Sequence, residues 1–135
     1  YGLNSLNSNS IEVRNLLKCI PNLLNSCMEP LTGQAIGMIL YGLQGLNSDD
    51  EEVRDILKCI PRLLLSCSEQ LSEKEVSMSL YGLQNLKNDC IEVRDILQCL
   101  PRLLSSCKIT FSEQAVSMSL YGLQNLKSEC IINNI

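Results

Sequence analysis

Cysteine is the residue type with the most chemistry to offer in this sequence of 135 residues. Six of the eight cysteines form Cys-x7-Cys pairs, which are Cys19 with Cys27, Cys59 with Cys67, and Cys99 with Cys107. Eight residues of helix span about 12 Å, which is too far for a disulfide. The chain also lacks histidine and any Cys-x2-Cys motif, so the usual zinc ligands are missing. We therefore expect reduced cysteines packed in the core and no metal site, with more reactive thiols at Cys90 and Cys130, which fall in turns.

Catalytic groups are hard to assemble from the other residue types. In the absence of histidine, no serine, threonine or cysteine has an evident general base beside it. The sequence contains no glycine-rich phosphate loop, and its recurring glutamates fall where helices are expected to begin. We expect neither enzymatic activity nor a bound cofactor.

A recurring set of serine, tyrosine and glutamine side chains could contact a ligand from one helix flank. These candidates are Ser77, Tyr81, Gln84, Ser117, Tyr121, Gln124 and, from an earlier copy, Gln44. Tyrosine can stack on RNA bases and glutamine can read their edges. The alternative is a polar flank in which tyrosine fills the space between repeats. The near identity of the copies favours this alternative, because reading a base sequence requires different residues in successive repeats.

Basic residues recur in the first half of each unit and could form a stripe. They are Arg14, Arg54, Lys58, Arg62, Arg94 and Arg102. Asp55 and Asp95 interrupt the stripe, and Asp50 precedes Arg54 by the spacing of a helical ion pair. We therefore favour a solvated face of mixed charge. Leu65 stands where the other copies have polar residues, so this exposed leucine is a candidate partner contact.

The elements that position these residues follow a period of forty. The stretch IEVRNLLKCIPNLLNSC, from Ile11, aligns without gaps with EEVRDILKCIPRLLLSC, from Glu51, and IEVRDILQCLPRLLSSC, from Ile91. Over 50–66, apolar residues recur at i, i+3, i+4 and i+7, which predicts an amphipathic helix. Asp49 or Asp50 is expected to cap this helix. Its proline, Pro61, is expected to kink it, and Pro21 and Pro101 are expected to kink the other copies.

A second helix is expected from Ser72 to about Lys87. Ser72 and Glu75 have the spacing of a capping box. The expected hydrophobic staples are Leu71 with Val76, Leu31 with Ile36, and Phe111 with Val116. Gly82 within this helix predicts that a neighbouring helix approaches closely there. The two halves together predict an all-α solenoid of stacked antiparallel helix pairs, one array over residues 1–135 with about three full repeats and partial repeats at both ends. Both ends resemble cuts in a longer array.

The unit resembles the octotricopeptide-type repeat, a helical hairpin found in organellar RNA-binding proteins, with related arrays in proteins that carry a RAP domain. The stretches that carry the resemblance are LSEKEVSMSLYGLQNL, from Leu71, and FSEQAVSMSLYGLQNL, from Phe111, each preceded by a leucine-rich helix. Tyr81-Gly82-Leu83-Gln84 stands where that family typically has Trp-Ala-Leu-Ala, and this chain has no tryptophan. The resemblance implies a plastid or mitochondrial location and RNA binding.

Net charge points to a different kind of partner. The chain has 11 Lys and Arg against 15 Asp and Glu, and its formal net charge of -4 opposes binding to a phosphate backbone. No apolar run approaches the length of a transmembrane helix, so we expect membrane contact only through a partner. We expect a non-catalytic scaffold or protein-interaction subunit that binds protein subunits of a larger assembly, in the reducing compartment of an organelle. The alternative is an organellar protein that reads single-stranded RNA through its second helices.

Overall fold

The structure is a computed structural model that describes residues 10–105 and 107–127, and this part of the chain is helical without strands. The expected all-α class is therefore confirmed. The elements are α1 (Ile11–Leu17), α2 (Ile20–Asn25), α3 (Gly33–Gly42), the 3-10 turn η2 (Leu43–Gly45), α4 (Glu51–Leu57), α5 (Ile60–Leu65), α6 (Glu73–Tyr81), α7 (Ile91–Ser105) and α8 (Glu113–Gly122).

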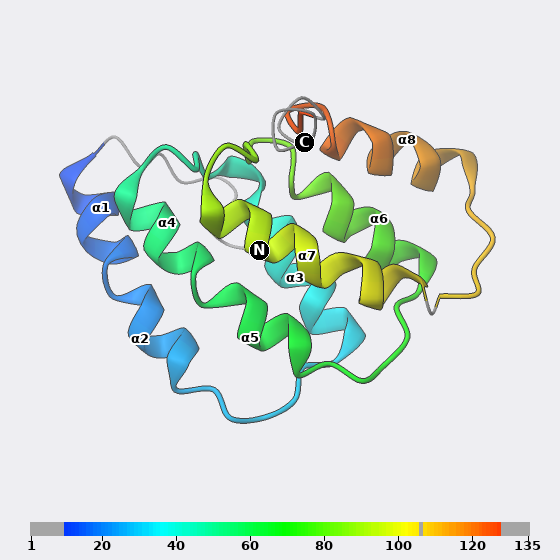
Figure 1. The fold of residues 1–135 in the computed structure, drawn as a ribbon, viewed down its shortest axis with the longest axis horizontal. Helices are drawn as coiled ribbons and strands as arrows, with labels where there is room; N and C mark the ends of the chain where they lie inside the picture. Colours follow the sequence, from blue (N-terminus) through cyan, green and yellow to red (C-terminus); the bar gives the residue numbers. More distant parts are fainter. Residues whose placement is uncertain (1–9, 106, 128–135) are drawn as a thin grey trace, which may run out of the picture.

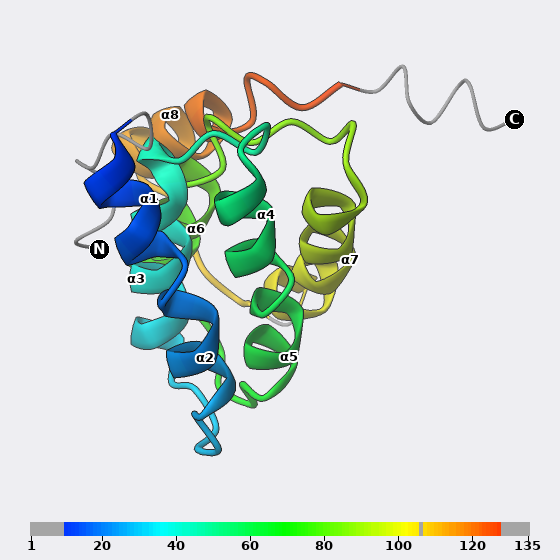
Figure 2. The ribbon, with the colours of Figure 1, turned by 90° about the vertical axis from the view of Figure 1, so that its left-hand side faces the viewer.

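The helices form two layers. The first layer contains α1–α2, α4–α5 and α7, which run side by side in Figure 1. The second layer contains α3, α6 and α8, in which α6 packs against both of the others (Figure 2). The core lies between the layers and joins residues of both, such as Leu17, Leu57 and Ile96 from the first with Ile36 and Val76 from the second. Each forty-residue copy therefore contributes one helix to the second layer and one helix, or a pair of short helices in its place, to the first.

The first helix of the unit is broken at its proline in two of the three copies. The prediction of one kinked helix over 50–66 is wrong, because α4 ends at Leu57 and α5 begins at Ile60 (Figure 1). Pro61 lies in the first turn of α5, where a backbone N–H has no hydrogen-bond partner within the helix, so proline costs no bond there. In the third copy, α7 continues through Pro101 as a single helix. Leu100 precedes this proline instead of the β-branched Ile60, and leucine is the better helix former.

The caps were predicted better than the helix lengths. Ser72 and Glu75 form the capping box, with reciprocal bonds between each side chain and the backbone of the other. Asp50 occupies the N-cap position of α4, but its side chain makes no capping hydrogen bond. The second helix is shorter than predicted, since α6 ends at Tyr81 rather than near Lys87. Gly82 and Asn85 after it are weak helix formers, and the chain turns there.

Close approach at the glycines is confirmed. A Cβ atom on Gly82 would lie 1.8 Å from the Leu40 carbonyl oxygen, and one on Gly122 would lie 1.8 Å from that of Leu80. The helices of the second layer therefore meet backbone to backbone, a distance that only glycine permits. Most residues of the predicted staples lie in or against the core, namely Leu31, Ile36, Leu71, Val76 and Phe111, whereas Val116 is exposed.

Candidate functional site

The predicted tyrosines form a stack. Tyr41 and Tyr81 have ring centroids 5.7 Å apart, Tyr81 and Tyr121 have centroids 5.6 Å apart, and both pairs are inclined by 20°. This offset geometry is the favourable arrangement for neighbouring aromatic rings. Tyr41 and Tyr81 are half-buried, and Tyr121 is exposed. The tyrosines therefore stack on one another from helix to helix along the second layer.

The predicted glutamines also contact one another. Gln84 donates from Nε2 to Gln44 Oε1 at 3.2 Å and to the Tyr81 carbonyl at 3.3 Å. Asn85 and Asn125 donate from their side-chain amides to the carbonyls of Gln44 and Gln84, respectively. These bonds cross from one copy to the next, so the structure uses Gln44 and Gln84 to connect the copies. Gln124 is exposed.

The predicted serines bond within their own helices. Ser77 is buried and donates to the Lys74 carbonyl at 3.0 Å. Ser117 is exposed and donates to the Glu113 carbonyl at 3.0 Å. The hydroxyls of Ser77 and Ser117 therefore bond within their own helices, and neither bonds to Tyr81 or Gln84.

A row of methionines, missed by the sequence reasoning, occupies the outer face of the second layer. Met38, Met78 and Met118, here called the methionine row, lie three residues before the stacked tyrosines in α3, α6 and α8. A groove of about 400 Å³ lies between α3 and α6 and is lined by Gln34, Met38, Ser72, Lys74, Glu75 and Met78. A second groove, of about 450 Å³, is lined by Glu73, Lys74, Ser77, Met78, Ser112, Gln114, Ala115 and Met118. The recurrence of methionine every forty residues was the signal that could have revealed this row.

The two glutamates beside the methionine row are engaged. Glu75 Oε1 accepts a hydrogen bond from the Ser72 N–H at 2.9 Å. Glu73 Oε1 accepts one from the Ser112 N–H at 2.9 Å, across the second groove. Hydrogen bonds from the Ser112 hydroxyl and backbone N–H hold the pKa of Glu73 below its ordinary value. Lys74 is exposed and forms no ion pair with any residue that the structure describes. Its ammonium group is therefore available to a ligand in both grooves.

The predicted basic stripe divides into separate contacts. Arg62 donates to the carbonyls of Leu24 and Cys27 at 2.9 and 3.1 Å. Arg102 makes the same bonds one copy later, to Leu64 and Cys67. Each guanidinium thus bonds to carbonyls at the C-terminal end of the corresponding helix of the preceding copy, where positive charge is favoured. The sequence reasoning missed this role, although the repetition of arginine beside proline was a visible signal.

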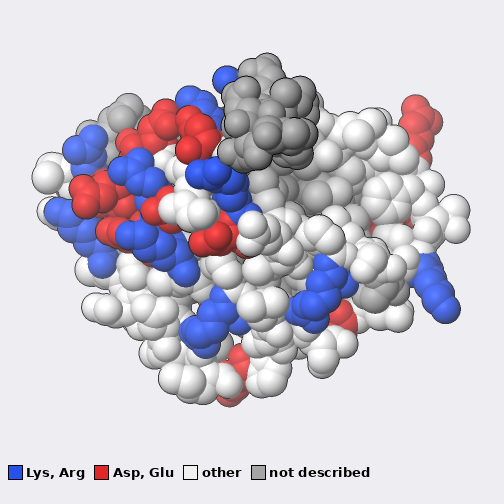
Figure 3. Space-filling view, viewed as in Figure 1, with Lys and Arg blue, Asp and Glu red and all other residues white. Residues whose placement is uncertain are grey.

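The other predicted surface residues make local contacts or lie exposed. Arg54 donates to the carbonyls of Ser48 and Asp49 at 3.3 and 2.7 Å. Lys58 pairs with Asp55 at 3.3 Å. Figure 3 shows acidic and basic residues interleaved over α1 and α4, in agreement with a face of mixed charge. Leu65 is 58% exposed on α5, as predicted.

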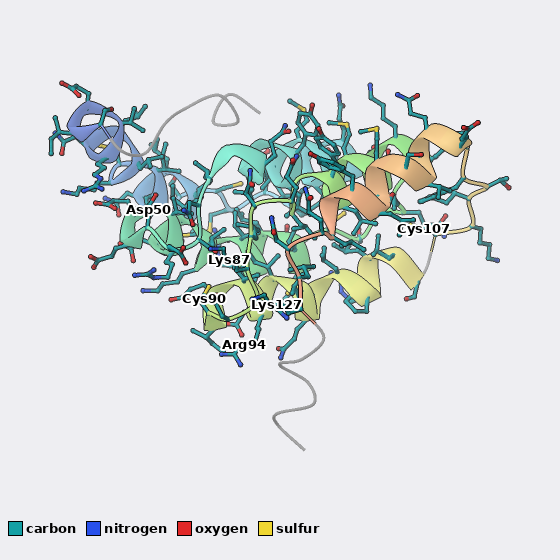
Figure 4. All side chains as sticks on the ribbon, turned by 90° about the horizontal axis from the view of Figure 1, so that it is seen from above. Asp50, Lys87, Cys90, Arg94, Cys107 and Lys127 are labelled. Carbon is teal, nitrogen blue, oxygen red and sulfur yellow. The ribbon has the colours of Figure 1, made fainter. Side chains whose placement is uncertain are left out.

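The cysteines are free thiols among the described residues. Burial raises the pKa of the Cys59 and Cys99 thiols. Cys90 is half-buried at the start of α7, near Lys87 and Lys127, whereas Cys107 lies beyond the far end of that helix (Figure 4). Cys19, rather than Cys90, is the exposed one. The other cysteine predicted to be reactive, Cys130, lies outside the described residues.

Metal, membrane and family comparisons add few constraints. Within residues 10–105 and 107–127, no cluster of histidine, cysteine, aspartate or glutamate has an arrangement that could hold a metal ion. No helix in this described part combines the length and apolar character needed to cross a bilayer. Comparison of the chain with protein-family models, curated proteins and solved structures finds no match. The chain's own surfaces are therefore the guide to its function.

Proposed function

We propose that this chain forms an α-solenoid with a forty-residue period and that it acts as a non-catalytic scaffold, binding a protein partner along the methionine row. The observation that supports this function is the division of the second layer into two parts. The tyrosines and glutamines are used between copies, whereas the methionines line grooves on the outer face. Solenoid surfaces of this kind commonly bind partners along several repeats at once.

The chemistry of the row fits a peptide surface. Methionine is flexible and polarizable, so it can adapt to apolar side chains of different shapes. Gln34 and Gln114 flank the row with groups that both donate and accept hydrogen bonds. Lys74 lies in both grooves. We therefore expect a partner that inserts apolar side chains into the grooves and places a carboxylate near Lys74.

RNA fits the same face less well. A base could enter the tyrosine stack only by separating rings that already lie 5.6 to 5.7 Å apart. The net charge of -4 and the single lysine in the grooves offer little to a phosphate backbone. The exposed Tyr121 and the resemblance to octotricopeptide repeats are the features that favour RNA. That resemblance is also our basis for placing the assembly in a plastid or mitochondrion.

Capture from the native source tests this proposal. The chain should retain a protein partner that also binds it directly after purification. Met78→Glu should abolish this binding, whereas Gln98→Glu, which adds the same charge on exposed α7, should leave it intact. Lys74→Glu should weaken the binding if the partner supplies a carboxylate.

RNA binding is measured in parallel. Sub-micromolar binding of single-stranded RNA, with a salt dependence that reports several phosphate contacts, would overturn the scaffold proposal. Loss of partner binding in both Met78→Glu and Gln98→Glu would also contradict it, because the methionine row would then not be the contact surface.

A further inference from the structure

The methionines of this chain fall into two groups. Met38, Met78 and Met118 recur every forty residues and line the two grooves, whereas Met28 lies in the connection between α2 and α3 and lines neither groove. Met38 is 42% exposed, Met78 and Met118 are half-buried, and Met28 is 82% exposed. Solvent therefore reaches the methionine row, and a small oxidant dissolved in water reaches it as well.

Each methionine of the row follows, by four residues, a side chain that donates hydrogen bonds. The pairs are Gln34 with Met38, Lys74 with Met78, and Gln114 with Met118. Residues four apart are neighbours on a helix surface, and both members of each pair line the same groove. The three donor side chains are exposed, and none of them bonds to another residue that the structure describes. A thioether sulfur is only a weak acceptor, so each donor lies beside a group that hardly binds it.

Oxidation by a peroxide would change the sulfur into a strong acceptor. The thioether sulfur attacks one oxygen of hydrogen peroxide, and the O–O bond breaks as an S–O bond forms. The proton of the transferred oxygen passes to the departing hydroxide, which leaves as water. Sulfur is oxidised by two electrons and the peroxide is reduced by two, which gives methionine sulfoxide. The new oxygen accepts a hydrogen bond, and the side chain four residues earlier can donate it.

We propose that the methionine row is an oxidation site and that conversion of its methionines to sulfoxides by a peroxide weakens partner binding. This inference rests on the proposed function, because the binding that oxidation controls is the one assigned to the same row. A sulfoxide makes the groove polar, and an apolar side chain that enters would bury its oxygen away from water. At Met78, the sulfoxide also competes with the carboxylate of the partner for the ammonium group of Lys74. Methionine sulfoxide reductases reverse the oxidation, with two thiols converted to a disulfide and water released.

The first test uses the dye anilinonaphthalenesulfonate as a probe of the grooves. Its aromatic rings and its sulfonate correspond to the apolar side chain and the carboxylate that we expect in the partner, and it binds exposed apolar surface. Hydrogen peroxide should weaken dye binding by about tenfold, the effect of one polar group buried without a partner. Dithiothreitol alone should not restore the binding, whereas methionine sulfoxide reductases with dithiothreitol should. This step separates the methionines from the cysteines, because thiols reduce disulfides and sulfenic acids directly.

Two matched variants assign the effect to the row. The triple variant Met38→Leu, Met78→Leu and Met118→Leu should bind the dye and keep that binding after peroxide, because leucine has a similar volume and no sulfur. Met28→Leu should lose dye binding after peroxide as the unmodified chain does. Circular dichroism confirms that both variants are folded. Equal losses in the triple variant and the unmodified chain, or full recovery with dithiothreitol alone, would overturn the proposal.

Mass spectrometry of proteolytic peptides locates the sulfoxides. Peroxide should add oxygen to Met38, Met78 and Met118 as well as to the more exposed Met28. Oxidation of Met28 with the row left unoxidised would overturn the proposal.

The purified partner distinguishes this proposal from the proposed function. Both Met78→Glu and peroxide should weaken its binding, and the triple leucine variant should bind it before and after peroxide. If Met78→Glu abolishes binding but oxidation of the row leaves it unchanged, the oxidation proposal is overturned and the scaffold proposal stands. If neither Met78→Glu nor peroxide affects the partner while the dye responds as expected, the proposed function is overturned, and control of partner binding with it.

Discussion

Single residues make the junctions between copies. Gly82 and Gly122 lack a side chain where two backbones meet, and Arg62 and Arg102 donate hydrogen bonds to carbonyls at the end of the corresponding helix of the preceding copy. These residues recur at the same place in the copies, yet their reasons differ, since glycine acts by size and arginine by charge. The recurrence of a residue in this sequence therefore indicates a contact between copies at least as often as it indicates a binding surface.

Replacing Gly82 tests the backbone contact directly. Gly82→Ala raises helix propensity but places a Cβ 1.8 Å from the Leu40 carbonyl oxygen, so we expect a loss of about 1 to 3 kcal/mol in the free energy of unfolding. Gly37→Ala is the matched control, because Ser77 and Ser117 already hold a Cβ at the corresponding positions. Urea denaturation followed by circular dichroism measures both variants. A stabilised Gly82→Ala protein would contradict the contact between α3 and α6.

Elements were predicted well where the signal was local. The capping box of Ser72 and Glu75 follows from residues three apart, and it is confirmed. The close approach at Gly82 was predicted from a glycine inside a helical pattern, and it is also confirmed. The break before Pro61 was missed because a proline inside a periodic pattern is compatible with either a kink or a new helix start. Which of these two outcomes occurs depends on how α4 and α5 each pack against the preceding copy.

The candidate surface was harder to predict because its residues interact across forty positions. Helical spacing placed Tyr81 and Gln84 on one flank correctly, but nothing local indicates that they contact Tyr41 and Gln44. The recurrence of Met38, Met78 and Met118 every forty residues likewise does not show that these residues line grooves. Such contacts require the stacking distance between helices, which the sequence of one repeat does not contain.

A carboxylate that links α6 to α8 makes stability dependent on pH. The folded-state pKa of Glu73 lies below its ordinary value of 4.5, so its charge stabilises the fold above that pH and the contribution is lost as pH falls through the lower folded value. Glu73→Gln keeps an acceptor oxygen but removes the charge. We expect it to lower stability at about pH 7 and to have a smaller effect at about pH 3, because Glu73 becomes protonated as the pH falls.

Denaturation at the two pH values measures this effect. Glu113→Gln is the control, because Glu113 begins α8 as Glu73 begins α6 and is exposed. If Glu73→Gln and Glu113→Gln behave alike at about pH 7, the bond from Glu73 to Ser112 does not contribute to stability.

At the scale of the whole molecule, each copy is bonded mainly to its neighbours. The backbone N–H of Lys87 donates to Ser48 Oγ at 3.2 Å, and that of Lys127 donates to Asn88 Oδ1 at 3.0 Å, so the turns are joined in the same order as the helices. The α6 helix contacts both α3 and α8. In such an arrangement, the free energy of unfolding is approximately the sum of the intrinsic stabilities of the copies and the contributions of the interfaces between neighbours.

This dependence on neighbours predicts unequal effects at the two glycine contacts. Gly122→Ala disturbs only the contact of α8 with α6, since its Cβ would meet the Leu80 carbonyl oxygen at 1.8 Å. We expect the amides of α8 to exchange faster with deuterium while those of α3 keep their protection. Gly82→Ala disturbs the contact of α6 with α3, and because α6 is the helix that packs against both α3 and α8, exchange should accelerate in all three helices. Equal loss of protection in α3 for both variants would mean that the copies open as one unit, because a local disturbance at α8 could then reach α3 only through unfolding of the whole.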